Sequence, residues 1–162
     1  AEAGNLTNVK LVEILGESVL DDDKTDHHIL KRLIIGTGIT DVNRNITTTN
    51  FKITQEPDDR ELILAYPNKL ATTKEVHAFM ESEGIQPEGP EYLARYTNEH
   101  INAGLEFPIV ALDPDKLWLD PSGRLCCVVL WIFDGVRYMG LGWVGARWLD
   151  CCRFVGSRKL KT

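Results

Sequence analysis

Hydrophobic and polar positions divide the chain into parts with different periods. Residues 8–67 carry short runs rich in Val, Ile, Leu and Thr, separated by polar turns, with no helical period. This pattern predicts extended structure. The predicted strands are Val9–Ile14, Ile29–Ile35, Asn50–Thr54 and Glu61–Ala65. As an alternative for the second of these, Leu30–Ile35 closes a short helix that begins near Asp26.

Two helices are predicted in the middle of the chain. Thr72 and Glu75 have the spacing of a capping box, and apolar residues recur behind them at helical spacing. These signals predict a helix over Thr72–Glu83, which Gly84 ends at the C′ position. A link that contains proline then leads into a second predicted helix near Glu91–Ala103.

The last third of the chain returns to strands and turns. Phe107–Leu112 is a short apolar run. Two longer runs, Arg124–Ile132 and Val136–Val144, flank the turn Asp134-Gly135, which predicts a β-hairpin. Arg153–Leu160 predicts a last strand. Strands, two helices and a strand-rich C-terminal third together predict an α+β fold.

Charge is distributed unevenly along the 162 residues, whose net charge is −6. Residues 121–162 carry a net charge of +5 and residues 1–120 a net charge of −11. An acidic chain is not typical of a nucleic-acid-binding protein. The longest apolar runs fall short of the roughly 18–20 residues that span a bilayer. We therefore expect neither nucleic-acid binding nor membrane insertion. Because Ala1-Glu2-Ala3-Gly4 has no basic or apolar stretch, we also expect no signal peptide in the given sequence.

The cysteines and tryptophans are concentrated in one region. All four cysteines lie in two adjacent pairs between residues 126 and 152, and all four tryptophans lie between 118 and 148. Neighbouring residues of a strand point to opposite faces, so vicinal thiols do not converge easily on one zinc ion. A disulfide between the two pairs stays open, and so does a role as small buried residues. We expect no metal and no cofactor.

The segment Pro121–Ser157 has an unusual composition for a surface hairpin. It contains no Glu, Gln, Asn, His, Thr or Lys, and its Trp and Arg residues are interleaved with Cys, Leu, Ile, Phe, Tyr and Gly. One interpretation is a hairpin buried on both sides. The other is an exposed face of adhesive residues, because aromatic anchors dominate binding energy and exposed apolar patches mark interaction sites. With no catalytic signature present, we do not predict an enzyme.

Several short motifs occur in roughly the last 55 residues. They are Phe107-Pro108-Ile109-Val110-Ala111-Leu112, Gly123-Arg124, Asp134-Gly135-Val136-Arg137, Gly142-Trp143-Val144, Arg147-Trp148 and Cys152-Arg153-Phe154-Val155-Gly156-Ser157-Arg158-Lys159. In these motifs the chain resembles the C-terminal part of variable proteins encoded by diversity-generating retroelements. One departure is Trp143-Val144-Gly145, where relatives commonly have Gly-Gly-Ser-Trp.

In that family a C-type lectin fold ends in a variable region, which mutagenic reverse transcription rewrites by altering template adenines. An Asn codon then becomes codons for Cys, Leu, Ile, Phe, Tyr, Gly, Ala, Asp or Ser, but not for Trp, Met, Lys, Gln or Glu. The resemblance thus implies that Trp131, Met139, Trp143 and Trp148 are scaffold. The implied variable, ligand-binding positions are Cys126, Cys127, Ile132, Phe133, Tyr138, Gly140, Gly142, Ala146, Leu149, Cys151 and Cys152.

The resemblance also implies a domain organisation. Residues 61–162 would form a C-type lectin-like ligand-binding domain with two helices and an antiparallel β-sheet, and its variable region would span about 121–157. Residues 1–60 would form a β-rich N-terminal segment or accessory module for attachment or self-association, which is compatible with a homo-oligomer. Calcium is not implied, because Asp134 and Asp150 are too few carboxylates for an oxygen shell.

The implied function is recognition of a protein or cell-surface ligand through a hypervariable face. Such proteins serve viral host attachment or cell-surface contact, which would place this one on a virion or a cell surface. The alternative is a small structural or interaction domain with a buried Cys/Trp-rich hairpin and no diversification.

Overall fold

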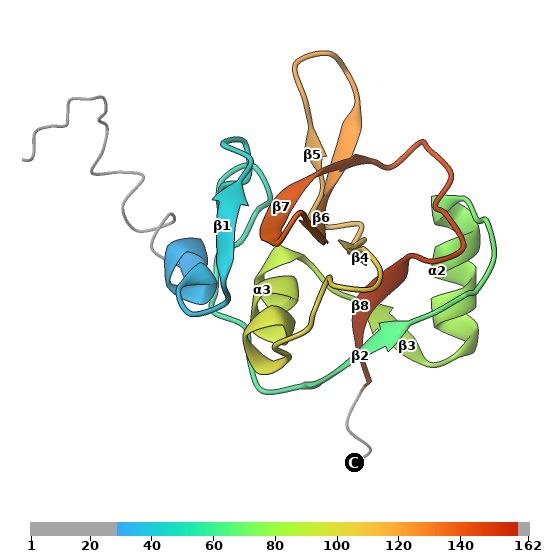
Figure 1. The fold of residues 1–162 in the computed structure, drawn as a ribbon. Helices are drawn as coiled ribbons and strands as arrows, with labels where there is room; N and C mark the ends of the chain where they lie inside the picture. The colour runs from blue at the N-terminus through green and yellow to red at the C-terminus, as the bar shows by residue number, and fades with distance from the viewer. Residues whose placement is uncertain (1–28, 159–162) are drawn as a thin grey trace, which may run out of the picture.

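The structure is a computed structural model, and it describes residues 29–158 (Figure 1). In this part of the chain three helices are present, over residues 29–34, α2 (Thr73–Ser82) and α3 (Pro90–Glu99). The strands are β1 (Ile39–Val42), β2 (Glu61–Ala65), β3 (Ile85–Pro87), β4 (Ile109–Ala111), β5 (Trp118–Leu119), β6 (Leu125–Phe133), β7 (Val136–Trp143) and β8 (Arg153–Arg158). Of the described helices, none has the length and apolar character needed to cross a membrane.

The strands form one open eight-stranded sheet. Its order is β1-β7-β6-β4-β8-β2, with β3 beside β8 and β5 beside β6. Most neighbours are antiparallel, but β1 pairs with β7 and β4 pairs with β8 in parallel. The expected combination of helices with a strand-rich C-terminal third is confirmed as a mixed α/β fold. The expectation of an antiparallel sheet is wrong for these two pairs. Their strands are far apart in sequence and are joined by long connections, which permit parallel pairing.

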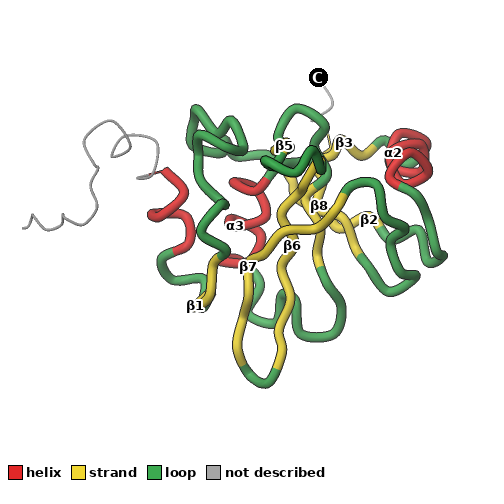
Figure 2. The backbone as a smooth tube through the Cα atoms, turned by 90° about the horizontal axis from the view of Figure 1, so that it is seen from above, coloured by secondary structure: helices red, strands yellow, loops and turns green. Residues whose placement is uncertain are grey.

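Both faces of the central sheet are covered. The helix of residues 29–34 and α3 lie on one side, and α2 lies on the other (Figure 2). Strand β4 shows the division: Ile109 and Ala111 pack in a cluster with Leu93 of α3, while Val110 packs in a cluster with Val76 of α2. Strands that are buried on both faces read as continuous apolar runs rather than as alternating ones. This double burial accounts for the apolar sequence in the middle of β6, from Cys126 to Leu130.

Helix α2 begins as the capping box predicts. The Thr72 hydroxyl accepts a hydrogen bond from the Glu75 N–H at 3.1 Å, and the Glu75 carboxylate accepts one from the Thr72 N–H at 2.9 Å. Val76 and Met80 are fully buried. Gly84 follows with a φ of 71°, the left-handed conformation that commonly ends a helix. The predicted helix is confirmed.

Helix α3 is shorter than the predicted range Glu91–Ala103. Pro90 occupies the first turn, where its missing N–H breaks no intrahelical hydrogen bond. The helix ends at Glu99 because His100 takes an extended backbone conformation, with φ −132° and ψ 102°. Turns then lead to Gly104, whose φ is 85°. The second helix is thus confirmed, and its C-terminal boundary is corrected.

The predicted strand Ile29–Ile35 is wrong, and the alternative that this stretch closes a helix is confirmed. Leu30, Leu33 and Ile34 stand at i, i+3 and i+4 and pack into the core, while the two residues between Leu30 and Leu33 are exposed. A helical stripe therefore explains the burial better than strand alternation does. The predicted strand Val9–Ile14 lies outside the described residues.

The predicted strand Asn50–Thr54 is also wrong, because these residues form a buried turn. The Ile53 N–H donates to the Thr48 carbonyl at 2.8 Å, and Lys52 has a φ of 58°. Phe51 and Ile53 are buried in the same cluster as α3. Their alternation with polar residues imitates a strand, although both side chains enter the core from a turn.

The described part of the N-terminal segment shares its sheet and its core with the rest of the chain. Strand β1 pairs with β7, and Ile46, Phe51 and Ile53 pack with Leu93 of α3. A strand of four residues needs such a partner, because isolated strand pairs are only marginally stable. Residues 29–60 therefore contribute to the same sheet and the same core cluster as residues 61–158.

Strand β8 lies inside the sheet. It pairs antiparallel with β2 and β3 and parallel with β4. The β2–β8 register runs from Glu61↔Arg158 to Ala65↔Phe154, so the first and last strands of residues 61–158 lie side by side. The predicted last strand is confirmed over its described residues, and β1, β3 and β5 are short strands that the sequence did not predict.

Candidate functional site

The β6–β7 hairpin carries many of the predicted variable positions. Its strands pair over eight residue pairs, beginning with Cys126↔Trp143. Asp134 and Gly135 form the two-residue turn with φ values of 53° and 77°, as a type I′ turn requires. The predicted hairpin is confirmed, and Figure 2 shows its tip projecting beyond the neighbouring strands.

The predicted variable positions fall into three classes of exposure. The exposed ones are Phe133, Leu149 and Cys151. The half-buried ones are Ile132, Tyr138, Gly142 and Ala146. The buried ones are Cys126, Cys127, Gly140 and Cys152. A buried side chain cannot touch a ligand while this fold is intact, so a binding surface is restricted to the first two classes.

The four cysteines are free thiols with different environments. Cys127 lies fully inside the cluster that α2 covers, and burial raises the pKa of its thiol to about 12. Burial likewise raises the pKa of Cys152 to about 11 and that of Cys126. Only Cys151 is exposed. In residues 29–158, no group of three His, Cys, Asp or Glu side chains is placed to hold a metal ion.

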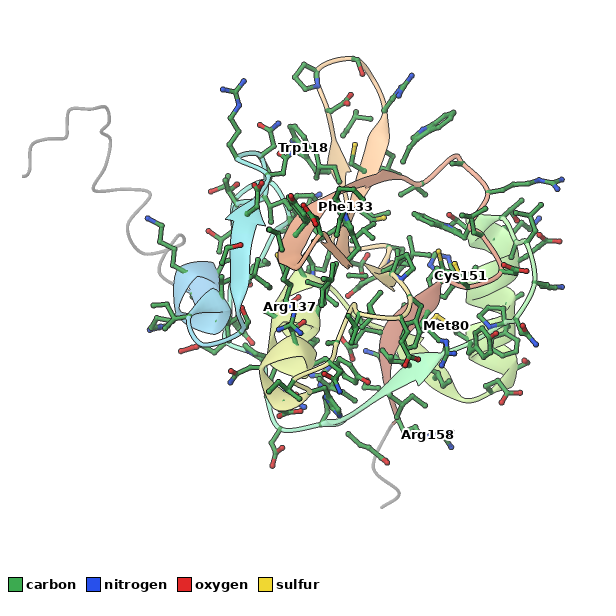
Figure 3. All side chains as sticks on the ribbon, in the orientation of Figure 1. Met80, Trp118, Phe133, Arg137, Cys151 and Arg158 are labelled. Carbon is green, nitrogen blue, oxygen red and sulfur yellow. The ribbon has the colours of Figure 1, made fainter. Side chains whose placement is uncertain are left out.

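One face of the outer hairpin carries a group of apolar and aromatic side chains that are exposed or half-buried. The register places Trp131 opposite Tyr138 and Phe133 opposite Val136, and strand alternation puts all four on the same face. We call these four residues the aromatic face. The Trp131 and Tyr138 rings are stacked, with centroids 5.5 Å apart and planes 15° apart. The Phe133 side chain at the tip is 68% exposed (Figure 3).

Gly140 gives the aromatic face its shape. A Cβ atom at Gly140 would lie 2.6 Å from Trp131 Cη2 and 2.9 Å from its Cζ3, so the indole ring occupies the space above the glycine. A Cβ atom at Gly142 would lie 2.8 Å from a Val129 methyl group and 3.1 Å from the Trp148 ring. The two glycines therefore let neighbouring side chains pack flat on β7. Larger residues at either position would displace an aromatic ring or a core residue.

Two exposed apolar residues that the sequence did not single out lie in the turn after α3, beside the outer hairpin. Ile101 is 86% exposed and Leu105 is 55% exposed. The Ile132 N–H donates to the Gly104 carbonyl at 3.0 Å, and Arg137 donates to the Ile101 carbonyl. These bonds hold the turn after α3 against the outer part of β6 and β7. Both residues lay near the end of the predicted second helix, where no periodicity identified them.

A second exposed apolar group lies at the opposite end of the hairpin. Leu119 and Leu125 are paired across β5 and β6, and Trp143 is 48% exposed beside them on β7. The Arg124 guanidinium lies 5.1 Å from the Trp143 ring centroid, within the range of a cation–π interaction. Exposed apolar side chains therefore flank both ends of the hairpin, while its middle is buried.

A charged cluster around the buried Glu88 also escaped prediction. Glu88 accepts hydrogen bonds from Arg60 Nη1 at 2.9 Å and from the Ser157 hydroxyl. Arg60 also hydrogen-bonds to Asp58, which lowers the pKa of that carboxyl group to about 2. The Arg60 guanidinium lies 4.6 Å from the Tyr92 ring centroid. Because each charge has a partner, this cluster is a structural clamp that holds the segment before β2 against α3.

Comparisons with known proteins add no further identification. No protein-family model, curated protein or solved structure matches the chain. The function is therefore inferred from the exposed residues of the hairpin and from their contacts.

Proposed function

We propose that this protein is a binding protein, not an enzyme, and that it holds a protein partner on the aromatic face. The observation that carries the proposal is the group formed by the exposed Phe133 and the half-buried Trp131, Val136 and Tyr138 on a hydrogen-bonded strand pair. Aromatic side chains are enriched among the residues that dominate interface energy. The Trp131 ring stacks on Tyr138 and lies over Gly140, which has no side chain. Trp131 therefore loses little side-chain freedom when a partner binds.

The finer form of the proposal is a C-type lectin-like domain of the retroelement variable-protein family. It is supported by the antiparallel pairing of β2 with β8, which brings together the first and last strands of residues 61–158. It is also supported by the order of elements along the chain, in which α2 and α3 come after β2 and before β4, β6 and β7. In this form the backbone stays fixed while exposed side chains are exchanged to recognise a new ligand.

Diversification of this kind would act on the exposed and half-buried positions. Those that a ligand can reach and that accept other side chains are Ile132, Phe133, Tyr138, Ala146, Leu149 and Cys151. Exchange at Cys127 or Gly140 would instead disturb the core or the Trp131 ring. The proposal therefore predicts which of the original positions vary and which do not.

A second candidate is an interaction domain with no diversification, and the burial of Cys126, Cys127 and Cys152 favours it. Under this reading the cysteines are small core residues, and the aromatic face binds one fixed partner. The two candidates share the binding surface and differ only in whether its side chains change between isolates.

Sequencing of the gene and its flanking DNA from several isolates of one source separates the two candidates. Variation confined to Phe133, Tyr138, Leu149 and the other reachable positions, with a near-repeat and a reverse transcriptase nearby, would support diversification. Variation scattered over the whole chain, without a repeat, would leave the fixed-partner candidate.

A stability experiment tests whether the outer hairpin can accept exchanged side chains without loss of the fold. A variant carrying Phe133→Ser, Tyr138→Ser and Leu149→Ser is expected to keep a thermal midpoint within a few degrees of the wild-type value, because these side chains are at least partly exposed. The matched variant Cys127→Tyr is expected to unfold at a much lower temperature, because it overfills the core. Equal losses in the two variants would contradict a display role for the outer hairpin.

A further inference from the structure

Arg153 lies between two aromatic rings, away from the hairpin. It is the first residue of β8 and pairs with Ile109 of β4. Tyr66 directly follows β2, and Phe107 lies two residues before β4. The guanidinium carbon of Arg153 lies 3.7 Å from the Tyr66 ring centroid and 4.0 Å from the Phe107 ring centroid. Both ring centroids therefore lie within 4.0 Å of the guanidinium carbon.

This guanidinium has no acidic partner among the described residues. The ion pairs of residues 29–158 involve Arg32, Arg60, Arg95 and Lys116, and none involves Arg153. The buried Nε atom of Arg153 makes no hydrogen bond to a described residue either. Stacking on the rings leaves the N–H groups at the edge of the guanidinium plane, where a planar oxyanion can accept two parallel hydrogen bonds.

A mainly apolar cavity of about 240 Å³ adjoins the ring pair and shares Phe107 with it. Its apolar lining comes from Leu64, Tyr96, Ala103, Phe107 and Ile109. Ile109, which also lines the cavity, is the β4 residue that pairs with Arg153 of β8. The cavity and the cation are thus neighbours.

We infer that Arg153 and this cavity form a binding site for a small carboxylic acid with an apolar group. The carboxylate would lie against the edge of the guanidinium, and the apolar group would enter the cavity. The cavity lining contains one acidic residue, Glu106, and no Lys or Arg. One guanidinium beside an acidic residue suits a singly charged carboxylate better than a doubly charged phosphate.

The site is independent of the proposed function. It is built on β2, β4, β8 and the turns beside them, whereas the aromatic face belongs to the outer part of β6 and β7. Failure of one proposal therefore leaves the other intact.

The test uses the full chain and a pair of ligands that differ only in charge. N-acetyl-L-phenylalanine carries the carboxylate and a benzyl group, and N-acetyl-L-phenylalaninamide lacks the charge. Titration followed by ¹H–¹⁵N NMR is expected to give a Kd of about 1 mM for the acid, as suits a ligand of this size. The amide is expected to bind at least about ten-fold more weakly. Equal binding of acid and amide, tighter binding of inorganic phosphate, or no saturable shift up to about 10 mM acid would overturn the inference.

Variants locate the site. Arg153→Gln is expected to weaken binding of the acid about ten-fold or more, and Arg153→Lys by less, because lysine keeps the charge but loses the planar fork. Arg147→Gln is the matched control, because Arg147 is exposed and lies in the loop after β7. Dispersed NMR spectra establish that each variant is folded. An equal loss in the Arg147 and Arg153 variants would place the acid elsewhere.

Tyr66→Leu provides a second variant in case Arg153→Gln does not fold. Tyr66 is 39% exposed, and leucine keeps an apolar side chain beside Arg153 while it removes the aromatic ring. Binding of the acid is expected to weaken several-fold, because the guanidinium loses one of the two rings that hold it in place. Unchanged binding in this variant would also overturn the inference.

Discussion

The inner and outer halves of the β6–β7 hairpin share one backbone pairing and have opposite surroundings. In the inner half, Cys127 and Val129 oppose Gly142 and Gly140, and the α2 side of the molecule covers them. In the outer half, Phe133 at the tip is mostly exposed. The two halves have similarly apolar sequences. The difference teaches that exposure along one strand pair is decided by what other elements place over it, and not by the strand sequence.

The largest expected difference between the halves is in stability. Leu130→Ala removes a fully buried side chain from the core, and we expect it to lower the free energy of unfolding by about 3 kcal/mol. Phe133→Ala removes a mostly exposed ring, and we expect a change of about 0.5 kcal/mol or less. Urea unfolding of both variants measures the contrast. Similar losses of unfolding free energy would show that the Phe133 side chain is packed against another part of the protein.

The second expected effect concerns alkaline pH. The pKa of Cys127 is raised to about 12 in the folded protein, whereas an unfolded thiol has a pKa of about 8.5. Its contribution to stability is therefore complete below about pH 8.5 and is lost as pH rises toward 12. Between pH 7 and pH 10 this group alone should remove about 2 kcal/mol.

Cys127→Ala isolates that contribution, because the other titrating groups are common to both proteins. The free energies of unfolding of the wild type and the variant are measured in urea at pH 7 and pH 10. The wild type is expected to lose more stability over this interval than the variant does. Parallel losses would mean that the Cys127 thiol reaches solvent.

A smaller effect, a coupling of about 1 kcal/mol, is expected at the boundary between the halves. Gly140→Val places a side chain where the Trp131 ring lies, and we expect a loss of about 2 kcal/mol. In a Trp131→Ala background the same substitution should cost at least about 1 kcal/mol less, because the clashing ring is gone. A double-mutant cycle by urea unfolding measures this coupling. Additive losses would show that Trp131 is not held over Gly140.

The smallest expected effect is seen in a count of reactive thiols in the native protein. Cys151 is exposed and the other three cysteines are buried, so one thiol should react rapidly with an aromatic disulfide reagent. The remaining three should react only when urea unfolds the chain. Cys151→Ser should abolish the fast phase and leave the slow one unchanged. A second fast thiol in the wild type would indicate that the hairpin opens.

Local signals in the sequence predicted the elements that depend on local chemistry. The capping box of Thr72 and Glu75 identified α2, and Asp134-Gly135 identified the hairpin turn. Both are satisfied by bonds and backbone conformations within a few residues. The short strand β1 was missed, because its partner β7 lies far along the chain and nothing local specifies their parallel pairing.

The candidate site was harder to predict for the same reason. Strand alternation correctly put Tyr138, Gly140 and Gly142 on one face of β7, opposite in orientation to Met139. It could not show that Trp131 and Trp148 cover the two glycines, because those contacts are tertiary. The turn after α3 brings Ile101 to the outer hairpin, and no spacing in the sequence predicts this contact.

The position of β8 has a consequence for how the protein forms during synthesis. Residues 153–158 are translated after every other described strand, yet they lie between β2 on one side and β3 and β4 on the other. Until β8 leaves the ribosome, β2 and β3 lack the strand with which they pair. The chain must therefore leave β2 and β3 unpaired until residues 153–158 emerge, a stage at which open strand edges are exposed to other chains.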